Sequence, residues 1–357
     1  MEYLQFLLIS FFSYVFIPLT FALSLYSFRR FIPLPFMAIL LVSMILSPFL
    51  ISIFLYYLLL LIPHQNPLFY VFMPFILVLF LFWMFRKNIP LFIGELNQRV
   101  RKSKIKSDWR YMAFMNYAAL VVISFFLLIF FNRMFTVSIL GHDMLEYALM
   151  ARIISNQQAI TYVSDIFDPS SGFYYVALHG LAFPLMGVWE NLWNRISGLN
   201  SDLFFRSLNL YFGIQIFLLL YYSLRKINPF LGSIALLLLV FTKGFFYALN
   251  DYHIDTCRIA VFCCSLFLLI YTIQQQNFYL AAIFAVACGF HGFTHSLGVF
   301  LSFLEIAVLF FSLRFNIRKR LVWVLGVLGI FLIMGGIHYF FDSLWGTHWI
   351  FKDIKFY

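Results

Sequence analysis

The sequence contains few charged residues, and acids are the scarcer kind. Only 11% of its 357 residues are Asp, Glu, Lys or Arg, and 14 residues are acidic, whereas about 25% of the residues in soluble domains are charged. Hydrophobic residues make up 64% of the chain, and 50 residues are Phe. This composition excludes an ordinary soluble domain and predicts an integral membrane protein.

Cysteines are also scarce. The four thiols belong to Cys257, Cys263, Cys264 and Cys288, which lie in or beside apolar segments without the spacing of a zinc site. We therefore expect buried, small hydrophobic side chains. No positively charged segment precedes the first apolar run at 6–28, so this run predicts a first span and not a cleaved signal peptide.

Apolar segments recur along the chain at nine places: 6–28, 36–62, 68–85, 112–134, 204–224, 231–249, 259–273, 278–311 and 321–341. Most have the roughly 17 to 25 residues of a transmembrane helix. The segment 278–311 is too long for one span and is interrupted by Gly289 and Gly292, so we expect two shorter helices folded into a hairpin. The predicted fold is all-α, a polytopic membrane helix bundle of about ten spanning or half-spanning helices.

Basic residues are concentrated in short connections between these segments. Five stretches hold 16 of the 24 Lys and Arg residues: Arg29-Arg30, Arg86-Lys87, 99–110, Arg225-Lys226 and 314–320. Ten helices place all five on one side, which the positive-inside rule makes cytoplasmic. Because this rule and anionic lipid explain the net charge of +10, we expect membrane lipids as partners and no nucleic acid.

We interpret residues 1–357 as a single transmembrane domain, because no internal repeat and no soluble domain remain once the spans are assigned. Residues 1–110 supply extra N-terminal helices and a basic cytoplasmic loop. Residues 111–341 form the core, in which the outer loop 135–203 is longer than an unstructured connection normally is. We therefore expect this loop to have structure of its own.

Two stretches of the outer loop have helical patterns. Apolar residues recur with helical spacing at 145–154, and Trp189 and Trp193 lie four residues apart within 183–199. Both stretches predict amphipathic helices that lie at the outer membrane interface.

The outer loop also contains acids beside a tyrosine, in the stretch Gly-His-Asp-Met-Leu-Glu-Tyr at 141–147. A helix that begins near Asp143 places Asp143, Glu146 and Tyr147 on one face. Two interpretations have similar weight: a capped interfacial helix with solvated acids, or a carboxylate general base with a second acid that raises its pKa or holds a metal. Arg152 is half a turn out of phase with Asp143.

Further ionisable residues lie toward the predicted outer ends of the spans: His179, Arg206, Lys243, His253, Asp255, Arg258, His291 and His295. Those at 250–258 predict a polar outer vestibule or simply a polar loop. His291 and His295 are four residues apart, as metal ligands on a helix are, but Gly292 between them disfavours a metal. A phosphate or headgroup contact, or satisfaction of the broken helix's backbone, is the favoured interpretation.

In their order along the chain, these features resemble the GT-C superfamily of polytopic membrane glycosyltransferases, in the branch of protein O-mannosyltransferases and the lipid A aminoarabinose transferase. The resemblance covers 112–341. The stretch HDMLEYALMAR resembles the acidic motif of that family, two later stretches resemble its helix starts, and GFHGFTHSLGVF resembles a turn in which His here replaces Lys. The residues that carry the resemblance are Asp143, Glu146, Tyr147, Arg152, His179, Arg206, Asp255 and His295.

The resemblance implies an inverting transfer of a sugar from a polyprenyl-phosphate-linked donor to a lipid, glycan or protein acceptor on the outer, periplasmic or lumenal face. Asp143 is then the general base, and Glu146 orients the acceptor or, in metal-dependent members, helps to ligate a divalent ion. Arg206 and Arg258 are the first choices to stabilise the leaving phosphate. The residues implied in substrate binding are Tyr147, His179, Arg206, Lys243, His253, Asp255, Arg258 and His295.

The sequence departs from the family pattern in two places. Met144 replaces a second acid, and the sequence ends at Tyr357, before the further helices and outer domain of many members. These departures favour a reduced member or one that acts with a partner subunit, and a non-catalytic scaffold is one alternative. Glu305, inside a predicted span, favours another alternative, a lipid or solute transporter. We expect an integral protein of the bacterial inner (plasma) membrane with its active site facing the periplasm or exterior.

Overall fold

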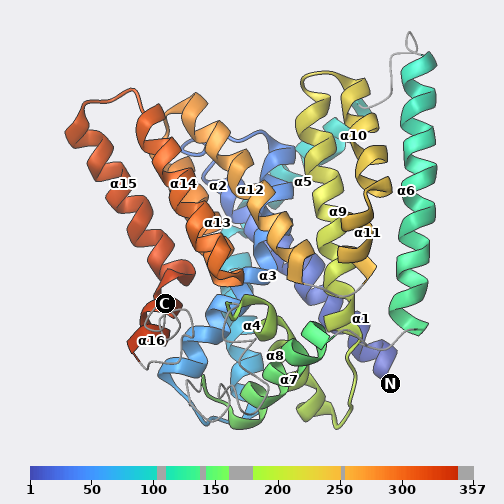
Figure 1. The fold of residues 1–357 in the computed structure, drawn as a ribbon, viewed down its shortest axis with the longest axis vertical. Coiled ribbons are helices and arrows are strands. Elements are labelled where there is room, and N and C mark those ends of the chain that lie inside the picture. The colour runs from blue at the N-terminus through green and yellow to red at the C-terminus, as the bar shows by residue number, and fades with distance from the viewer. Residues whose placement is uncertain (103–109, 137–141, 161–179, 251–253, 345–357) are drawn as a thin grey trace, which may run out of the picture.

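The computed structural model describes residues 1–102, 110–136, 142–160, 180–250 and 254–344. Every regular element in these ranges is a helix (Figure 1), which confirms the predicted all-α class. Seven of the helices are long and apolar enough to cross a bilayer: Glu2–Ser27, Phe36–Leu61, Pro67–Arg99, Tyr117–Thr136, Leu203–Arg225, Ile254–Gln275 and Ile317–Phe340. Three shorter apolar helices accompany them: Phe230–Phe241, Phe278–Thr294 and Ser296–Ser312.

The N-terminal third forms three of the candidate spans. Its elements are α1 (Glu2–Phe11), η1 (Phe12–Phe16), α2 (Ile17–Ser27), α3 (Phe36–Leu61), α4 (Pro67–Phe85), η2 (Arg86–Asn88) and α5 (Ile89–Lys102). The start of α4 shows why the chain turns where it does. The Asn66 side chain accepts a hydrogen bond from the Leu68 backbone N–H at 2.9 Å, and Pro67 supplies a first helical residue that needs no such partner.

The remaining spans and half-spans run back and forth between the two ends of the bundle (Figure 1). They are α6 (Arg110–Thr136), α9 (Leu203–Arg225), α10 (Pro229–Phe241), α11 (Lys243–Asn250), α12 (Ile254–Gln275), α13 (Phe278–Thr294), α14 (Ser296–Ser312), α15 (Ile317–Phe331), η5 (Leu332–Gly336) and α16 (Ile337–Leu344). The predicted division of 278–311 into two shorter helices is confirmed, but the break lies at His295, which is extended with φ −162° and ψ 148°, whereas Gly289 and Gly292 lie inside α13.

The prediction of one span at 231–249 was wrong. Thr242 adopts an extended ψ of 116° and separates α10 from α11. Another helix bends at Gly335, where η5 has a φ of 154°, a conformation that residues with a Cβ rarely adopt. A Cβ at Gly335 would also lie 2.4 Å from the Gly289 carbonyl oxygen, so the bend brings η5 directly against the α13 backbone.

Two helices outside the spans, α7 (His142–Gln157) and α8 (Ala182–Ser197), lie together at one end of the bundle (Figure 1). The prediction that the stretches 145–154 and 183–199 are helical is confirmed. However, α8 is not a half-exposed interfacial helix, because Trp189 and most of its other side chains are buried. The N-terminal helices cover it: the Ser52 hydroxyl of α3 donates to the Ala182 carbonyl at 2.8 Å, and the Phe75 ring of α4 lies 6.4 Å from the Trp189 ring.

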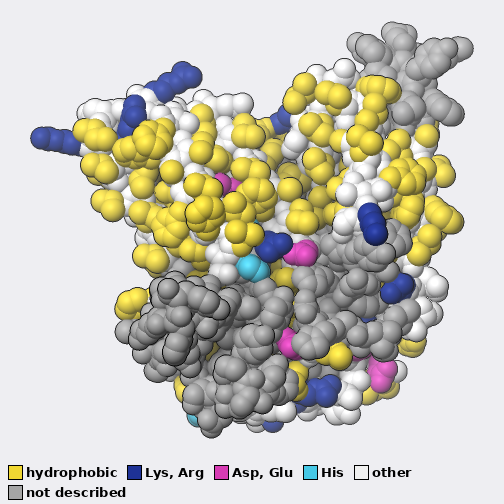
Figure 2. Space-filling model, viewed as in Figure 1, with side chains coloured by type: hydrophobic (Ala, Val, Ile, Leu, Met, Phe, Trp, Pro, Cys, Tyr) yellow, Lys and Arg dark blue, Asp and Glu magenta, His cyan; other side chains and the backbone are white. Residues whose placement is uncertain are grey.

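The basic segments lie at the opposite end. Glu95 accepts hydrogen bonds from both Arg29 and Arg99, at 3.2 and 2.9 Å. The Asn277 side chain donates to the Phe31 carbonyl at 3.0 Å, which brings the connection before α13 to the same place. Hydrophobic side chains cover much of the visible surface between the two ends (Figure 2). We call the end that carries α7 and α8 the outer end.

Candidate functional site

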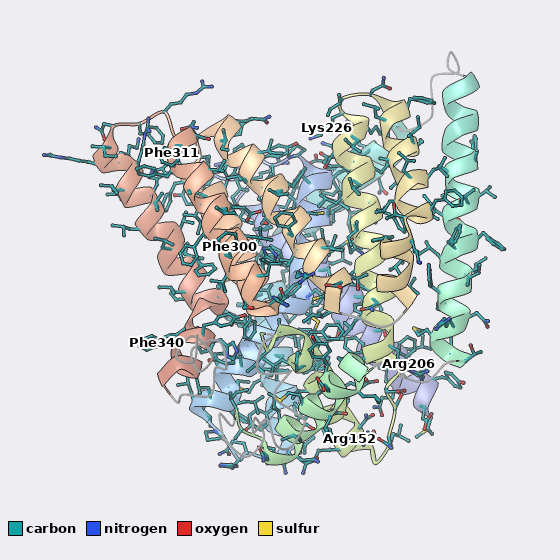
Figure 3. All side chains as sticks on the ribbon, viewed as in Figure 1. Arg152, Arg206, Lys226, Phe300, Phe311 and Phe340 are labelled. Atoms are coloured by element: carbon teal, nitrogen blue, oxygen red, sulfur yellow. The ribbon has the colours of Figure 1, made fainter. Side chains whose placement is uncertain are left out.

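The acidic helix α7 begins at the outer end with Asp143 as its second residue. The Asp143 side chain lies outside the described side chains. One turn further on, Glu146 is 6% exposed and Tyr147 is 1% exposed. The Tyr147 ring meets the Phe183 ring of α8 edge to face, with centroids 5.7 Å apart. Glu146 is therefore not a solvated acid, and Arg152 further along α7 is exposed (Figure 3).

Close packing holds α7 on α8. A Cβ built on Gly187 of α8 would lie 2.8 Å from the Cβ of Ala151, so the two helices approach more closely than ordinary side chains permit. Near the end of α7, the Arg195 guanidinium donates to the Ser155 carbonyl at 2.5 Å. The helix that carries the acids is therefore fixed along its length by its neighbour.

The connection between α3 and α4 holds the last residues of α7. The Tyr70 hydroxyl lies 3.1 Å from the Gln158 carbonyl oxygen and 2.8 Å from that of Ile62. The His64 backbone N–H donates to Gln158 at 2.8 Å. These bonds anchor α7 to the N-terminal spans, so the N-terminal helices contribute to the support of the candidate site.

A second group of charges surrounds the start of α9. The Arg206 guanidinium pairs with Asp202 at 2.7 Å. Glu190 of α8, which sequence reasoning did not single out, accepts hydrogen bonds from the backbone N–H groups of Phe204 and Phe205 at 2.8 and 3.0 Å. Glu190 thus caps the first turn of α9 from another helix and holds the turn on which Arg206 lies.

Burial dominates the electrostatics of Glu190, whose exposure is 3%. Desolvation raises the pKa of Glu190 to about 8, although the two N–H donors and nearby Arg206 act in the opposite direction. A carboxyl group with this pKa is largely protonated at neutral pH. The signal that could have identified it is an acid between two tryptophans on an otherwise apolar helix.

A third group lies at the start of α12 and at the break between α13 and α14. Arg258 pairs with Asp255 at 2.6 Å, and the two side chains are 26% and 33% exposed. His291 lies within electrostatic range of Arg258 and His295, so these three residues form one neighbourhood. Figure 2 shows basic, acidic and histidine side chains gathered at the lower border of the hydrophobic surface.

The other predicted site residues have different positions. The His295 ring caps α14, because its Nδ1 accepts a hydrogen bond from the Leu297 backbone N–H at 2.9 Å. Lys243 is the exposed first residue of α11. His179 and His253 lie outside the described residues. The Gly180 backbone N–H, however, donates to the Thr294 carbonyl at 3.1 Å, which places the residue after His179 at the hairpin break.

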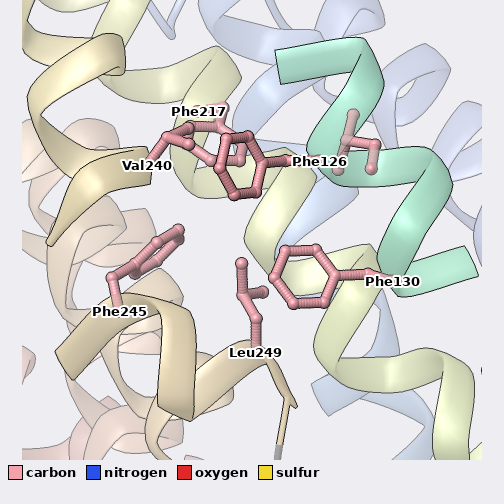
Figure 4. Close-up of a pocket in the computed structure, with 7 residues that line it drawn as sticks. Phe126, Phe130, Phe217, Val240, Phe245 and Leu249 are labelled. Carbon is pink, nitrogen blue, oxygen red and sulfur yellow. The ribbon is translucent and has the colours of Figure 1, made fainter. Parts of the chain in front are cut away.

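An apolar hollow lies between α6 and the layer of α9, α10 and α11 (Figure 4). It is small, with a free volume of about 10 Å³, and is lined by Phe126, Leu127, Phe130, Phe217, Val240, Phe245 and Leu249. Leu249 lies near the end of α11, six residues before Asp255. The hollow and the ion pair at the start of α12 are therefore close along the chain.

The described residues do not form a divalent-metal site. No group of three His, Cys, Asp or Glu side chains with metal-ligand geometry occurs among them. Asp202 and Asp255 are each paired with an arginine, and both oxygens of Glu190 accept backbone N–H groups.

Comparison with protein-family models, with curated proteins and with solved structures finds no match to this chain. The class of the protein is therefore inferred from its helices alone. The seven apolar helices of span length make it a polytopic α-helical membrane protein. Its family is not identified by any relative, so a particular activity is a matter for proposal.

Proposed function

We propose that the protein is an inverting membrane glycosyltransferase that uses a polyprenyl-phosphate-linked sugar. The observation that carries the proposal is the rigid mounting of α7, with Asp143 in its first turn and Glu146 and Tyr147 buried one turn later. The same outer end carries Arg206 and Arg258 near the starts of α9 and α12. A base and cations for a leaving phosphate are the two requirements of this transfer.

In the proposed reaction, the Asp143 carboxylate takes the proton of an acceptor hydroxyl. The oxygen attacks the anomeric carbon, a new C–O bond forms, and the bond from that carbon to the phosphate oxygen breaks. The electron pair leaves with the lipid phosphate, whose negative charge Arg206 or Arg258 stabilises. Glu146 orients the acceptor, and Tyr147 shapes its site.

We further propose the bacterial inner membrane, with the outer end facing the periplasm, because the basic segments gather at the other end.

The test is transfer of radiolabelled sugar from a panel of polyprenyl-phosphate sugars by the purified full-length protein. Wild type is compared with Asp143→Asn and with Glu95→Gln, an acid at the other end of the bundle, each with and without chelator. We expect Asp143→Asn to lose at least about 100-fold in turnover, the range for removal of a general base. Equal transfer by wild type and Asp143→Asn would refute the assignment of the base, and a loss with chelator would demonstrate a metal requirement.

A specific observation favours a second candidate, transport. Glu305 of α14 is 4% exposed and accepts hydrogen bonds from Ser265 of α12 at 2.8 Å and from Cys288 of α13 at 3.3 Å. A buried acid among membrane helices is a feature of proton-coupled carriers. Uptake into proteoliposomes that is abolished by Glu305→Gln, with no sugar transfer by wild type, would favour transport over the glycosyltransferase. If neither sugar transfer nor uptake differs between wild type and the variants Asp143→Asn and Glu305→Gln, a scaffold subunit would be favoured.

A further inference from the structure

Glu305 is a carboxyl group in the interior of the helix bundle that the proposed sugar transfer does not use. It lies near the middle of α14, a helix of 17 residues. One of its hydrogen-bond partners, Ser265, lies near the middle of α12, a helix of 22 residues. Both side chains are buried. An ionised carboxyl at this depth lowers stability strongly unless a cation accompanies it.

The helices around Glu305 bring no cation to it. The titratable groups within its electrostatic range are the thiols of Cys263 and Cys264 on α12 and of Cys288 on α13. The helix α15 also packs on α14. Charged and histidine side chains of α12, α13 and α15 lie toward the helix ends: Asp255, Arg258, His291 and residues 318–320. Among the residues that the structure describes, none of these forms an ion pair with Glu305.

The contacts of Ser265 favour the protonated form of this carboxyl. The Ser265 hydroxyl oxygen lies 2.8 Å from Oε1 of Glu305 and 2.8 Å from the Phe262 carbonyl oxygen. A hydroxyl has one hydrogen, so it donates to only one of these oxygens at a time. If the carboxyl is ionised, the other contact joins two acceptors without a hydrogen. If the carboxyl is protonated, its O–H donates to Ser265 while Ser265 donates to Phe262, and both contacts are hydrogen bonds.

The second carboxyl oxygen has a donor as well. The Cys288 thiol lies 3.3 Å from Oε2 of Glu305, and the Cys288 carbonyl accepts a hydrogen bond from Ser302 of α14 at 3.0 Å. Hard cations such as alkali ions prefer oxygen ligands to sulfur. A neutral carboxyl, in contrast, needs one acceptor for its O–H and a donor for its carbonyl oxygen, and Ser265 and Cys288 supply these. The arrangement therefore suits a proton better than a metal cation.

We propose that Glu305 is a proton-binding site in the membrane interior and that it holds its proton when α12, α13 and α14 are packed as in this structure. The protonated carboxyl joins the three helices through Ser265 and Cys288. Release of the proton leaves a buried charge without a cation, so it requires α14 to separate from its neighbours or water to enter between them. The inference is independent of sugar transfer. It deepens the second candidate, transport, by naming the proton as the coupled ion.

The experiment records the infrared absorption of the purified full-length protein in nanodiscs from pH 5 to pH 10. Subtracting the spectrum of Glu305→Gln isolates the C=O stretch of a protonated Glu305, because other buried carboxyls such as Glu190 are present in both samples. We expect this band at pH 7 and a reversible decrease as the pH is raised. A band that is absent at every pH would overturn the inference, and so would a band that persists unchanged to pH 10, which is the behaviour of a purely structural acid.

Two substitutions of Cys288 should shift the band in opposite directions. Cys288→Ala removes the donor to Oε2 and should raise the stretching frequency, whereas Cys288→Ser supplies a stronger donor and should lower it. Cys263→Ala is the matched control, since this thiol lies within electrostatic range of Glu305 but is not one of its described hydrogen-bond partners, and it should leave the frequency unchanged. Equal frequencies in all three variants would overturn the inference. If Glu305→Gln does not fold, the two Cys288 variants decide.

A membrane-soluble carbodiimide detects the same proton chemically. A protonated carboxyl adds across one C=N bond of dicyclohexylcarbodiimide: a C–O bond forms, the proton moves to nitrogen, and nothing leaves. The reagent can approach through lipid, because Leu304 and Val308 beside Glu305 on α14 are each 49% exposed. We expect the peptide that contains Glu305 to gain the mass of the reagent at pH 7 and to gain less as the pH is raised. Glu95, a partly exposed acid at the inner end, should stay unlabelled.

Two comparisons complete the test. Protection of Glu305 from the carbodiimide by Na⁺, relative to choline at the same pH, would overturn the inference in favour of a metal cation site. Sugar transfer is measured on the same preparations. Absence of the infrared band would overturn the proton site without bearing on the glycosyltransferase, whereas a wild type that shows the band and transfers no sugar would support the proton site and count against the glycosyltransferase.

Discussion

Replacing Glu190 with Gln tests whether a buried, protonated carboxyl caps α9. In the folded protein the pKa of Glu190 is raised to about 8 from an ordinary value of 4.5. The folded state therefore binds more protons than the unfolded state between these values. Stability from this group is fully present below about pH 4.5 and is lost as the pH rises to about 8.

The magnitude follows from the two pKa values. The difference between about 8 and 4.5, at about 1.4 kcal/mol for each pH unit, corresponds to roughly 5 kcal/mol over the whole window. The Gln side chain does not titrate, so Glu190→Gln removes this dependence. Its amide oxygen accepts only one of the two N–H groups, of Phe204 or Phe205, so the variant loses about 1 kcal/mol at low pH. We expect the two stability curves to cross, with the variant more stable near pH 8.

The assay is the midpoint of thermal unfolding in nanodiscs from pH 5 to pH 9, compared between wild type and Glu190→Gln. Glu95→Gln serves as the control, because Glu95 is a partly exposed acid at the other end of the bundle. The difference between wild type and Glu190→Gln should change with pH, and the difference for Glu95→Gln should change much less. Parallel curves for wild type and Glu190→Gln would refute the reasoning, because they would mean that Glu190 is ionised in the folded protein throughout.

Two further substitutions test how α7 is held. Gly187→Ala places a Cβ 2.8 Å from that of Ala151, so we expect the free energy of unfolding, measured by heat or denaturant, to fall by about 1 to 2 kcal/mol. Gly94 has open space around it, so Gly94→Ala should raise the free energy of unfolding by about 0.5 to 1 kcal/mol through helix propensity. Tyr70→Phe removes a buried hydroxyl that lies between Ile62, Gln65 and Gln158. We expect this variant to lower the free energy of unfolding by about 1 to 3 kcal/mol and to speed proteolysis near the end of α7. Tyr117→Phe, 61% exposed, should change neither measurement, and equal responses of Tyr70→Phe and Tyr117→Phe would contradict this role.

The segments that form helices were predictable because composition decides them. Hydrophobic runs of span length leave the backbone no alternative in a bilayer, and the two helices at 278–311 were indicated by length, although the break lies at His295 and not at Gly289 or Gly292. Breaks without such signals were not predictable. Thr242 separates α10 from α11, yet it follows a continuous apolar run and is neither Gly nor Pro. The available sequence signal for this break was the polar pair Thr242-Lys243.

The site was predictable only where partners are local in sequence. The spacing of three between Asp255 and Arg258 and the spacing of four between Asp202 and Arg206 could have indicated these ion pairs, although neither pairing was predicted. The cap that Glu190 provides joins residues 14 and 15 positions apart on two helices whose approach depends on tertiary packing. His291 was singled out by its place at the helix break, but its burial against α14 could not be read from periodicity.

The N-terminal helices explain why α8 is buried and why its polar residues are tolerated. The Gln5 side chain of α1 donates to Asn194 at 2.7 Å and accepts from Ser197 at 2.5 Å, and the Trp189 indole donates to Ser13 at 3.1 Å. Between membrane helices, hydrophobic burial does not discriminate one apolar neighbour from another, so such polar pairs and close contacts determine register. Because α8 in turn holds both α7 and the first turn of α9, the position of the acids relative to Arg206 depends on residues near the N-terminus.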